Sequence, residues 1–145
     1  TLGYGFPTAL GVKVANPDKV VMSITGDGGF QFSIQELATA KQFKIGLITI
    51  VFNNSAFGNV RRDQETRFGG RVIGADLENP DFLAIAKAYN IHGYRVEDAE
   101  GLREVLIEMV EKDEPVVIEV SLETGSETSP WRFILREAFA SKTIV

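Results

Sequence analysis

Short apolar segments alternate with helical patterns along the whole of this chain, and no other feature of the sequence limits the possible folds as strongly. The strands predicted from this alternation span residues 20–25, 45–52, 92–96 and 116–122. Strands that alternate with helices are typical of a parallel sheet whose crossover helices lie on both faces. The segment 45–52 is apolar at almost every position, so we place it inside the sheet, buried on both sides. The predicted class is α/β, with three layers, a mostly parallel sheet and helices on both faces.

Helix signals lie between these segments. Pro7 suits the first turn of a helix, which should run to Ala15 because a second proline follows two residues later. Ser33 and Glu36 have the spacing of a capping box, so a second helix should begin there and continue to about Phe43.

Two more helices are expected further along the chain. Asn79-Pro80 should cap one that ends near Tyr89, and residues 102–110 carry the apolar stripe of an amphipathic helix. Residues 55–78, in contrast, form a long polar connection, and structureless loops of this length are usually functional or disordered. We expect residues 57–74 to be mobile in the isolated chain.

The expected organisation is one domain, residues 1–122, followed by a C-terminal tail, residues 123–145. Trp131 and Phe133 in this tail should pack or line an interface. The chain opens at Thr1, inside a glycine-rich segment and without Met, so we also expect it to be a piece of a longer polypeptide. The N-terminal part of the domain would then precede it.

Composition and charge exclude several classes of function. The 20 acidic and 15 basic residues give a formal charge of −5, the wrong sign for a general attraction to nucleic acid. The absence of cysteine and the single His92 exclude a thiolate nucleophile and a zinc site built from Cys or His. No uncharged apolar run approaches the ~20 residues that span a bilayer. We therefore expect neither a nucleic-acid partner nor a membrane segment.

Polar motifs follow the first two predicted strands directly. Gly26-Asp27-Gly28-Gly29 comes after the first strand and Asn53-Asn54 after the second, with one helix between them. A right-handed βαβ unit places the carboxyl ends of its two strands side by side, so Asp27 and Asn54 should lie close together where α/β sheets bind ligands. Each motif alone is more typical of a turn, and only the combination indicates a site.

The donor types at this edge suit a magnesium ion and a phosphate. Glycines allow a phosphate to approach the backbone, and one carboxylate plus one amide oxygen leaves the other Mg²⁺ positions to phosphates, a backbone carbonyl and water. No Walker motif occurs, and Gly3-x-Gly5 lacks the preceding strand and third glycine of a dinucleotide fingerprint. A bound diphosphate would therefore be held through the metal.

These motifs resemble the signature of thiamine-diphosphate-dependent enzymes, in which Gly-Asp-Gly is followed one βαβ unit later by Asn-Asn. Residues 1–9, Thr-Leu-Gly-Tyr-Gly-Phe-Pro-Thr-Ala, are similar to the Met-Gly-Phe-Gly-Leu-Pro-Ala-Ala segment of acetolactate synthase-like enzymes. The resemblance is strong over residues 1–60 and extends beyond them only as a pattern. It implies the thiamine-diphosphate-binding fold and the diphosphate-binding domain of the acetolactate synthase-like and 2-oxo-acid decarboxylase family.

The resemblance implies a set of binding residues. Asp27 and Asn54 would be metal ligands through their side chains, and Ala56 through its backbone carbonyl. Leu2 would lie beneath the cofactor and hold its two rings in a V shape. The alternative is an ordinary apolar residue at the point where the chain enters the first helix. The residues expected to bind the cofactor are Leu2, Gly26, Asp27, Gly28, Gly29, Phe30, Asn54, Ala56, Phe57, Gly58, Asn59 and Val60.

The resemblance also implies that the chemistry is shared between domains. The glutamate that activates the cofactor in this family belongs to a pyrimidine-binding domain of a neighbouring subunit, and Glu36 is expected to cap a helix instead. No catalytic residue is therefore expected in this chain. A homodimer or homotetramer is expected of the whole protein, with a cytoplasmic location.

Charged residues follow the second motif, where family members place residues that cover the cofactor and meet the substrate. An arginine could pair there with an acidic substrate, whereas a solvated charged loop would explain the same pattern. His92 lies far from both motifs in the sequence and is expected to be structural. The loop residues concerned are Asn59, Arg61, Arg62, Asp63 and Arg67.

The expected function is that of a Mg²⁺-dependent, thiamine-diphosphate-binding domain in an acetolactate synthase-like enzyme, a lyase or transferase that decarboxylates or carboligates 2-oxo acids. The isolated chain should be inactive. One alternative is a non-catalytic cofactor-binding or assembly domain of a thiamine-diphosphate enzyme complex. Another is an unrelated phosphate-binding α/β module, which the match in residues 1–9 disfavours.

Overall fold

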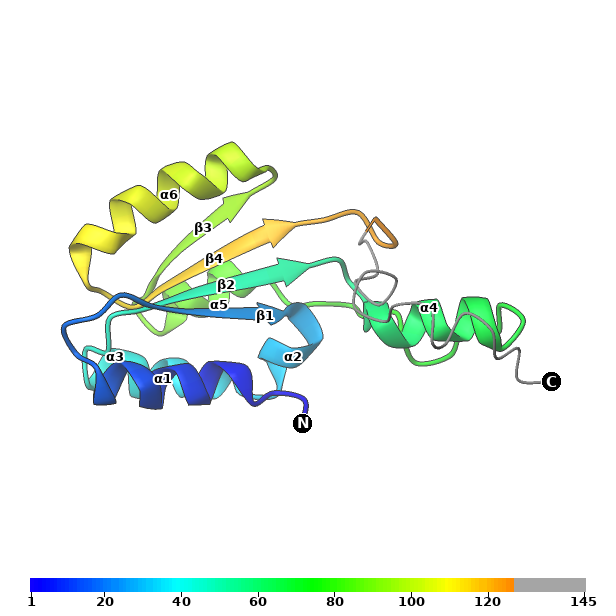
Figure 1. The fold of residues 1–145 in the computed structure, drawn as a ribbon, viewed down its shortest axis with the longest axis horizontal. Coiled ribbons are helices and arrows are strands. Elements are labelled where there is room, and N and C mark those ends of the chain that lie inside the picture. Colours follow the sequence, from blue (N-terminus) through cyan, green and yellow to red (C-terminus); the bar gives the residue numbers. More distant parts are fainter. Residues whose placement is uncertain (127–145) are drawn as a thin grey trace, which may run out of the picture.

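A four-stranded parallel sheet forms the centre of the computed structural model, which describes residues 1–126 (Figure 1). The strands are β1 (Val21–Gly26), β2 (Leu47–Asn53), β3 (His92–Val96) and β4 (Val116–Ser121). Their spatial order is β1-β2-β4-β3, and every neighbouring pair is parallel. The predicted parallel α/β sheet, with the second strand inside it, is confirmed.

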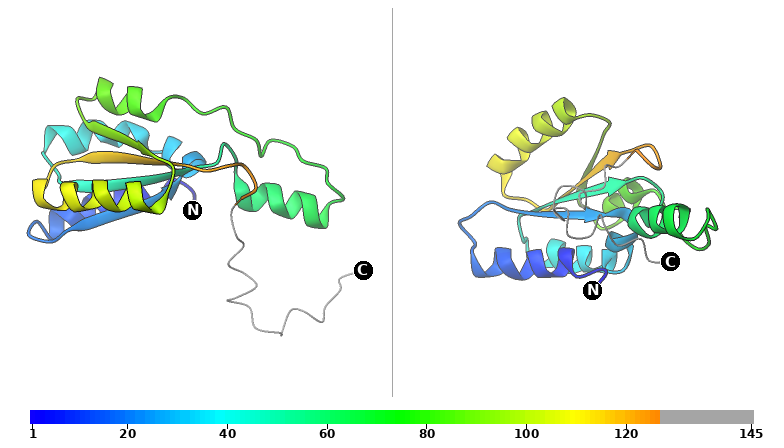
Figure 2. Two further views of the ribbon diagram at one scale, coloured as in Figure 1. Left: turned by 90° about the horizontal axis from the view of Figure 1, so that it is seen from above. Right: turned by 45° about the vertical axis from the view of Figure 1, so that its right-hand side comes forward.

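Helices cover both faces of this sheet (Figures 1 and 2). On one face lie α1 (Gly5–Ala15), α3 (Leu37–Gln42) and α5 (Phe82–Ala88), whose apolar side chains share a core with the strands. On the other face lies α6 (Ala99–Lys112), which includes the predicted amphipathic stripe. The predicted three-layer arrangement is therefore confirmed, and α1 begins two residues earlier than Pro7.

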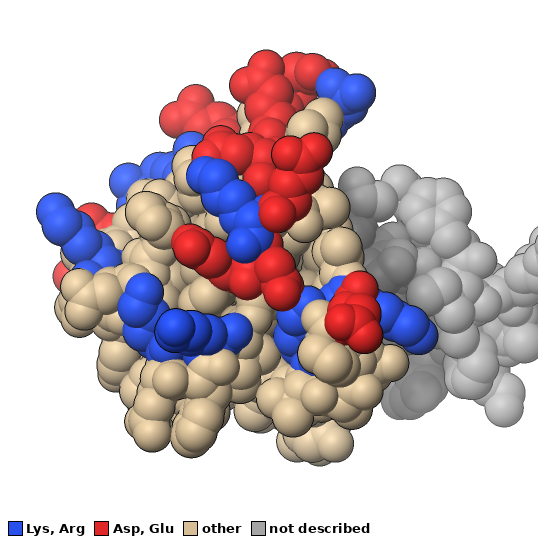
Figure 3. Space-filling model, turned by 90° about the vertical axis from the view of Figure 1, so that its left-hand side faces the viewer, with Lys and Arg blue, Asp and Glu red and all other residues tan. Residues whose placement is uncertain are grey.

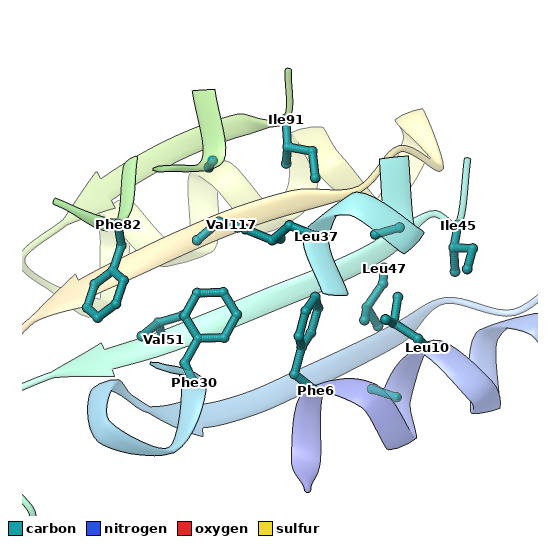
Figure 4. Packing of buried hydrophobic residues seen from close by; sticks show 13 residues of the cluster. Phe6, Leu10, Phe30, Leu37, Ile45, Leu47, Val51, Phe82, Ile91 and Val117 are labelled. Atoms are coloured by element: carbon teal, nitrogen blue, oxygen red, sulfur yellow. The ribbon is translucent and has the colours of Figure 1, made fainter. Parts of the chain in front are cut away.

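Three phenylalanine rings hold the first core together (Figure 4). Phe30 lies between Phe6 of α1 and Phe82 of α5, at ring-centroid distances of 5.3 Å and 5.8 Å. Phe30 belongs to α2 (Asp27–Gln31), a five-residue helix that the sequence did not predict. A single helical turn is unstable in isolation, so burial of this ring anchors α2 to the core.

No helix among residues 1–126 covers the outer face of β1. Met109 of α6 and the side chains around it cover β2, β3 and β4, whereas Met22 and Ile24 of β1 remain exposed, Ile24 by 70%. Since β1 is also an edge strand, apolar surface is available beside the carboxyl end of the sheet.

Ser33 and Glu36 do not form the predicted capping box. Ile34–Glu36 form a short 3-10 helix, η1, ahead of α3, without a side-chain cap. In a capping box the Ser33 hydroxyl would accept from the Glu36 backbone N–H, but that N–H donates to the Ser33 carbonyl at 3.0 Å. The Ser33 hydroxyl is left buried with no hydrogen-bond partner among the described residues, and the Glu36 carboxylate accepts from Thr39 at 2.7 Å.

Asp81, and not the predicted Asn79-Pro80, caps α5. Its carboxylate accepts from the backbone N–H groups of Leu83 at 3.0 Å and Ala84 at 3.1 Å. The prediction was displaced by two residues because Asn79 turns its side chain away from the helix and toward the sheet edge.

The long connection between β2 and α5 contains a helix, α4 (Gly58–Arg67), which the sequence did not predict. It projects beyond the carboxyl edge of the sheet (Figure 2) and has no buried residue. Two backbone hydrogen bonds of 2.8 Å close the base of the connection, Phe57 N–H to Ala75 C=O and Leu77 N–H to Ser55 C=O. Greater mobility of residues 57–74 stays a prediction.

The amino edge of the sheet is held by a buried lysine. The Lys13 ammonium donates to the carbonyls of Pro17 and Lys19, each at 2.8 Å, and lies 2.7 Å from the Asp113 carboxylate. Acidic side chains gather in the upper part of this face of the molecule, with basic ones around and below them (Figure 3). This edge is thus closed by polar contacts, whereas the opposite edge carries the sequence motifs.

No helix among residues 1–126 is long and apolar enough to cross a membrane. Trp131 and Phe133 lie outside the described residues. The division into a domain of residues 1–122 and a tail of residues 123–145 stays a prediction.

Candidate functional site

Asp27 lies at the carboxyl end of β1, where the strand passes directly into α2. Its side chain is buried and is held through both carboxylate oxygens. Oδ1 accepts from the Gly28 backbone N–H at 2.8 Å, and Oδ2 accepts from the Asn79 side-chain amide at 2.7 Å. The carboxylate is therefore fixed at the sheet edge.

The second motif leaves the neighbouring strand at the same edge. Gly26 of β1 pairs with Phe52 of β2, so Asp27 and Asn53 each lie one residue beyond this pair, at the carboxyl ends of their strands. A left-handed residue, Ser55 (φ 55°), then turns the chain, and the half-buried Asn54 side chain accepts from the Ala56 N–H at 3.2 Å. The predicted convergence of the two motifs is what the parallel β1–β2 pairing produces.

A cleft of about 430 Å³ lies at this edge. Ten of the twelve predicted cofactor residues line it, while the side chains of Asn54 and Phe30 do not. Phe30 lies in the core, so only its backbone could reach a ligand. The predicted residues that line the cleft are Leu2, Gly26, Asp27, Gly28, Gly29, Ala56, Phe57, Gly58, Asn59 and Val60, and Thr1, Gly3, Tyr4, Gly5, Ile24 and Thr25 complete it.

Gly28 is required by the packing of the cleft wall. A Cβ at this position would lie 2.3 Å from the Phe57 ring, so the first motif and the connection after the second one touch here. Gly26 faces open space, since no atom of the described residues lies within 4 Å of a Cβ built on it. Leu2 is 58% exposed, and its methyl group lies 3.7 Å from a Cβ built on Gly29. The lining of the cleft thus combines glycine backbone with the exposed side chain of Leu2.

A hydrogen-bonded network that the sequence did not predict extends from Asp27 across the sheet. The Asn79 amide donates to Asp27 and, at 2.8 Å, to the Asn53 side chain. Asn53 donates in turn to the Glu119 carboxylate of β4 at 2.7 Å, and Glu119 accepts from Arg95 of β3 at 3.0 and 3.1 Å. A charged residue inside the apolar strand Val-Val-Ile-Glu-Val was the available signal that Glu119 has a buried partner.

The far end of this network is charged. The hydrogen bond to Glu119 raises the pKa of the Arg95 guanidinium, which stays positive throughout the ordinary pH range. Arg95 also lies 3.4 Å from Asp81. The Ala84 N–H lowers the pKa of the Asp81 carboxyl, with smaller contributions from Leu83 and Arg95 in the same direction.

The charged residues of the connection pair mainly with each other. Arg62 donates to Asn59 at 2.7 Å, Arg61 donates to Asp76 at 2.8 Å and also pairs with Glu65, and Arg67 lies 3.9 Å from Asp63. These contacts fit a solvated charged surface, which lies on helix α4 and not on the expected loop. Only Asn59 of the predicted substrate-facing group lines the cleft.

His92 and Glu36 lie outside the site. His92 is exposed at the start of β3, and neither residue lines the cleft. Within residues 1–126, no three His, Cys, Asp or Glu side chains form a group that could hold a metal. A metal at this edge would need neutral oxygen ligands beside Asp27.

Several known proteins are similar to this chain. It is 37% identical over 130 residues to the probable acetolactate synthase large subunit of Methanococcus aeolicus, which covers 89% of this chain and 22% of the relative. It is 42% identical over 120 residues to the mitochondrial acetolactate synthase catalytic subunit of Aspergillus candidus, covering 83% and 17%. The chain thus spans about a fifth of the length of these curated relatives.

A solved structure agrees with these relatives. The thiamine diphosphate-dependent 4-hydroxybenzoylformate decarboxylase of Rhodococcus jostii superposes with a TM-score of 0.80 at 32% identity, over 87% of this chain and 24% of that one. Residues 1–120 match the family described as thiamine pyrophosphate enzyme, C-terminal TPP binding domain. The chain therefore belongs to the thiamine pyrophosphate enzymes, as their C-terminal cofactor-binding domain of the acetolactate synthase-like type.

Proposed function

We propose that this chain binds thiamine diphosphate through Mg²⁺ at the carboxyl edge of β1 and β2. Asp27, the Asn54 side chain and the Ala56 carbonyl are the proposed metal ligands. The observation that carries the proposal is the cleft at this edge, which Asp27 and the glycines of the first motif line together with Ala56 and the residues that follow the second motif.

The chemistry of the donors fits the proposed metal. All three ligands are oxygen atoms and only one is charged, so phosphates and water can complete the octahedral shell that Mg²⁺ prefers. The chain has a formal charge of −5, which repels a diphosphate, and the metal would supply the local attraction. In the cleft, Gly26 and Gly29 leave the backbone accessible to a phosphate.

The other residues would place the organic part of the cofactor. Leu2 is exposed within the cleft and would support the cofactor's rings, and Phe57 and Val60 line the same cleft and would supply further apolar surface. Bound thiamine diphosphate supplies an electron sink for cleavage of the bond next to a 2-oxo acid carbonyl. This chain contributes binding, orientation and partial exclusion of water.

The whole protein is proposed to decarboxylate or carboligate 2-oxo acids, as a homodimer or homotetramer in the cytoplasm. A neighbouring subunit would provide a pyrimidine-binding domain with the activating glutamate. The exposed side chains of Leu2, Tyr4 and Ile24 support this arrangement, because they join the cleft to the uncovered face of β1. Apolar surface of this kind is typical of a protein interface.

Calorimetry of thiamine diphosphate binding in the presence of Mg²⁺ tests the proposal. Asp27→Ala and Asn54→Ala should abolish the Mg²⁺-dependent binding, and EDTA should remove it from the wild-type protein. Asp18→Ala and Asn16→Ala, at the amino edge, are matched controls that should bind as the wild type does. Full binding by Asp27→Ala would show that the metal site is wrong.

A turnover assay tests whether catalysis needs a group that this chain does not contain. The chain of residues 1–145 should not decarboxylate 2-oxo acids with saturating thiamine diphosphate and Mg²⁺, because the general-base contribution of about 10²–10⁴-fold is missing. Activity above the free-cofactor background would place the activating group within this chain. Recovery of activity on addition of the pyrimidine-binding domain would support the shared site, and its failure would favour the non-catalytic alternative.

A further inference from the structure

Asn79 uses every polar atom of its side chain at the carboxyl edge of the sheet. Its Nδ2 donates to Asp27 Oδ2 at 2.7 Å and to Asn53 Oδ1 at 2.8 Å. Its Oδ1 accepts from Gln31 Nε2 at 2.6 Å. This set of partners fixes the orientation of the amide, because a flipped amide would point its oxygen at the Asp27 carboxylate.

These bonds hold the short helix that carries Asp27. Asp27 and Gln31 stand one helical turn apart in α2, and both bind Asn79. Three residues after Asn79, Phe82 packs against Phe30 of the same helix at 5.8 Å. The segment 79–82 therefore clamps α2 from the polar side and from the core.

Asn79 also reaches the turn that follows β2. Asn53 Oδ1, which accepts from Asn79, accepts from the Ser55 backbone N–H at 3.2 Å as well. Ser55 lies between Asn54 and Ala56, the other proposed metal ligands. One amide thus contacts both structures that present ligands to the proposed metal.

We propose that Asn79 is a positioning residue for the metal site, an inference that rests on the proposed function. Its amide holds one carboxylate oxygen of Asp27 without adding a charge that would compete for the metal. The carboxylate is then already ordered before the metal arrives. Replacing a residue that holds a metal ligand in this way typically lowers the metal affinity by about 10–100-fold.

The placement of Asn79 in the chain gives the contact a second consequence. Asn79 follows immediately after the connection of residues 55–78, which contributes Ala56, Phe57, Gly58, Asn59 and Val60 to the cleft. The contact with Asp27 therefore fixes the far end of this connection to the metal edge.

The test is the Mg²⁺ concentration at which thiamine diphosphate binding is half complete, measured by calorimetry on the protein and its variants. Asn79→Ala should raise this midpoint about 10–100-fold and still reach full binding at saturating Mg²⁺. Asp27→Ala should not recover at any Mg²⁺ concentration. Asn16→Ala should keep the wild-type midpoint. Electron paramagnetic resonance of bound Mn²⁺ should show the same ranking, which a general loss of stability would not produce.

An unchanged Mg²⁺ midpoint in a folded Asn79→Ala protein would overturn the inference while Asp27→Ala still fails to bind. Wild-type binding by Asp27→Ala would instead overturn the proposed function. If Asn79→Ala does not fold, Gln31→Met decides the question, because it removes only the donor to Asn79 Oδ1. Its midpoint should rise several-fold, and an unchanged midpoint would contradict the proposed role.

Discussion

Replacing Arg95 by alanine should destabilise the protein more than replacing its partner Glu119 by leucine. The two members of this ion pair differ in burial, since the Glu119 side chain is 5% exposed and the Arg95 side chain 47%. Arg95→Ala leaves a buried carboxylate with Asn53 as its remaining side-chain donor. Glu119→Leu leaves a guanidinium that already reaches water and Asp81.

The geometry gives an approximate size for each effect. Breaking a buried pair by removing one partner costs about 3–5 kcal/mol, and the half-exposed position of Arg95 puts Arg95→Ala near the lower limit, at about 3 kcal/mol. Glu119→Leu mainly leaves the Asn53 amide without an acceptor, at about 1 kcal/mol. The double variant should therefore be about 2 kcal/mol more stable than Arg95→Ala alone, because leucine removes the stranded charge.

Urea unfolding followed by circular dichroism measures the three free energies, with the wild type as reference. The decisive comparison is whether adding Glu119→Leu to Arg95→Ala restores stability. This prediction is wrong if the losses in unfolding free energy of the two single variants add in the double variant, or if Glu119→Leu alone destabilises the protein more than Arg95→Ala. Burial of the Glu119 carboxylate would then not determine the stability contributed by this ion pair.

Three further predictions follow from other contacts. Gly28→Ala should cost about 1–3 kcal/mol in urea unfolding because its Cβ would lie 2.3 Å from the Phe57 ring, and Phe57→Leu should relieve most of this loss. The pKa of Asp81 lies below its ordinary value of 3.8, chiefly through the Ala84 N–H, so its cap stabilises α5 above about pH 4 and this stability is lost as the pH falls through the lowered pKa. In acid unfolding, Asp81→Ala should therefore remove the loss of stability that the wild type shows as the pH falls through this pKa. Residues 57–74 should exchange amide hydrogens rapidly in the apo chain and slowly in the cofactor-loaded assembly, and strong protection in the apo chain would contradict this.

The parts of the fold that depend on local periodicity were predictable from the sequence. The four predicted strands are those of the structure, and residues 45–52, apolar at almost every position, contain an internal strand because this pattern is typical of a strand covered on both faces. The two motifs were placed correctly at one edge because parallel strands joined by a helix bring their carboxyl ends together.

The errors arose where a distant partner competes with a local signal. Asn79 resembles a helix cap locally, but Asp27, 52 positions away, takes its amide. Ser33 and Glu36 have the right spacing for a capping box, but a backbone hydrogen bond between them already occupies the N–H that the box requires.

The two hydrogen bonds that close the connection after β2 also determine where the sequence and length of this domain can vary. Both are made by backbone atoms, at Phe57 and Leu77, so they do not depend on which side chains lie between them. Doubling the length of such a loop costs only about 0.6 kcal/mol in closure entropy. Residues 58–74 can therefore vary in length and sequence, which would change the lining of the cleft at Gly58, Asn59 and Val60 while the sheet stays the same.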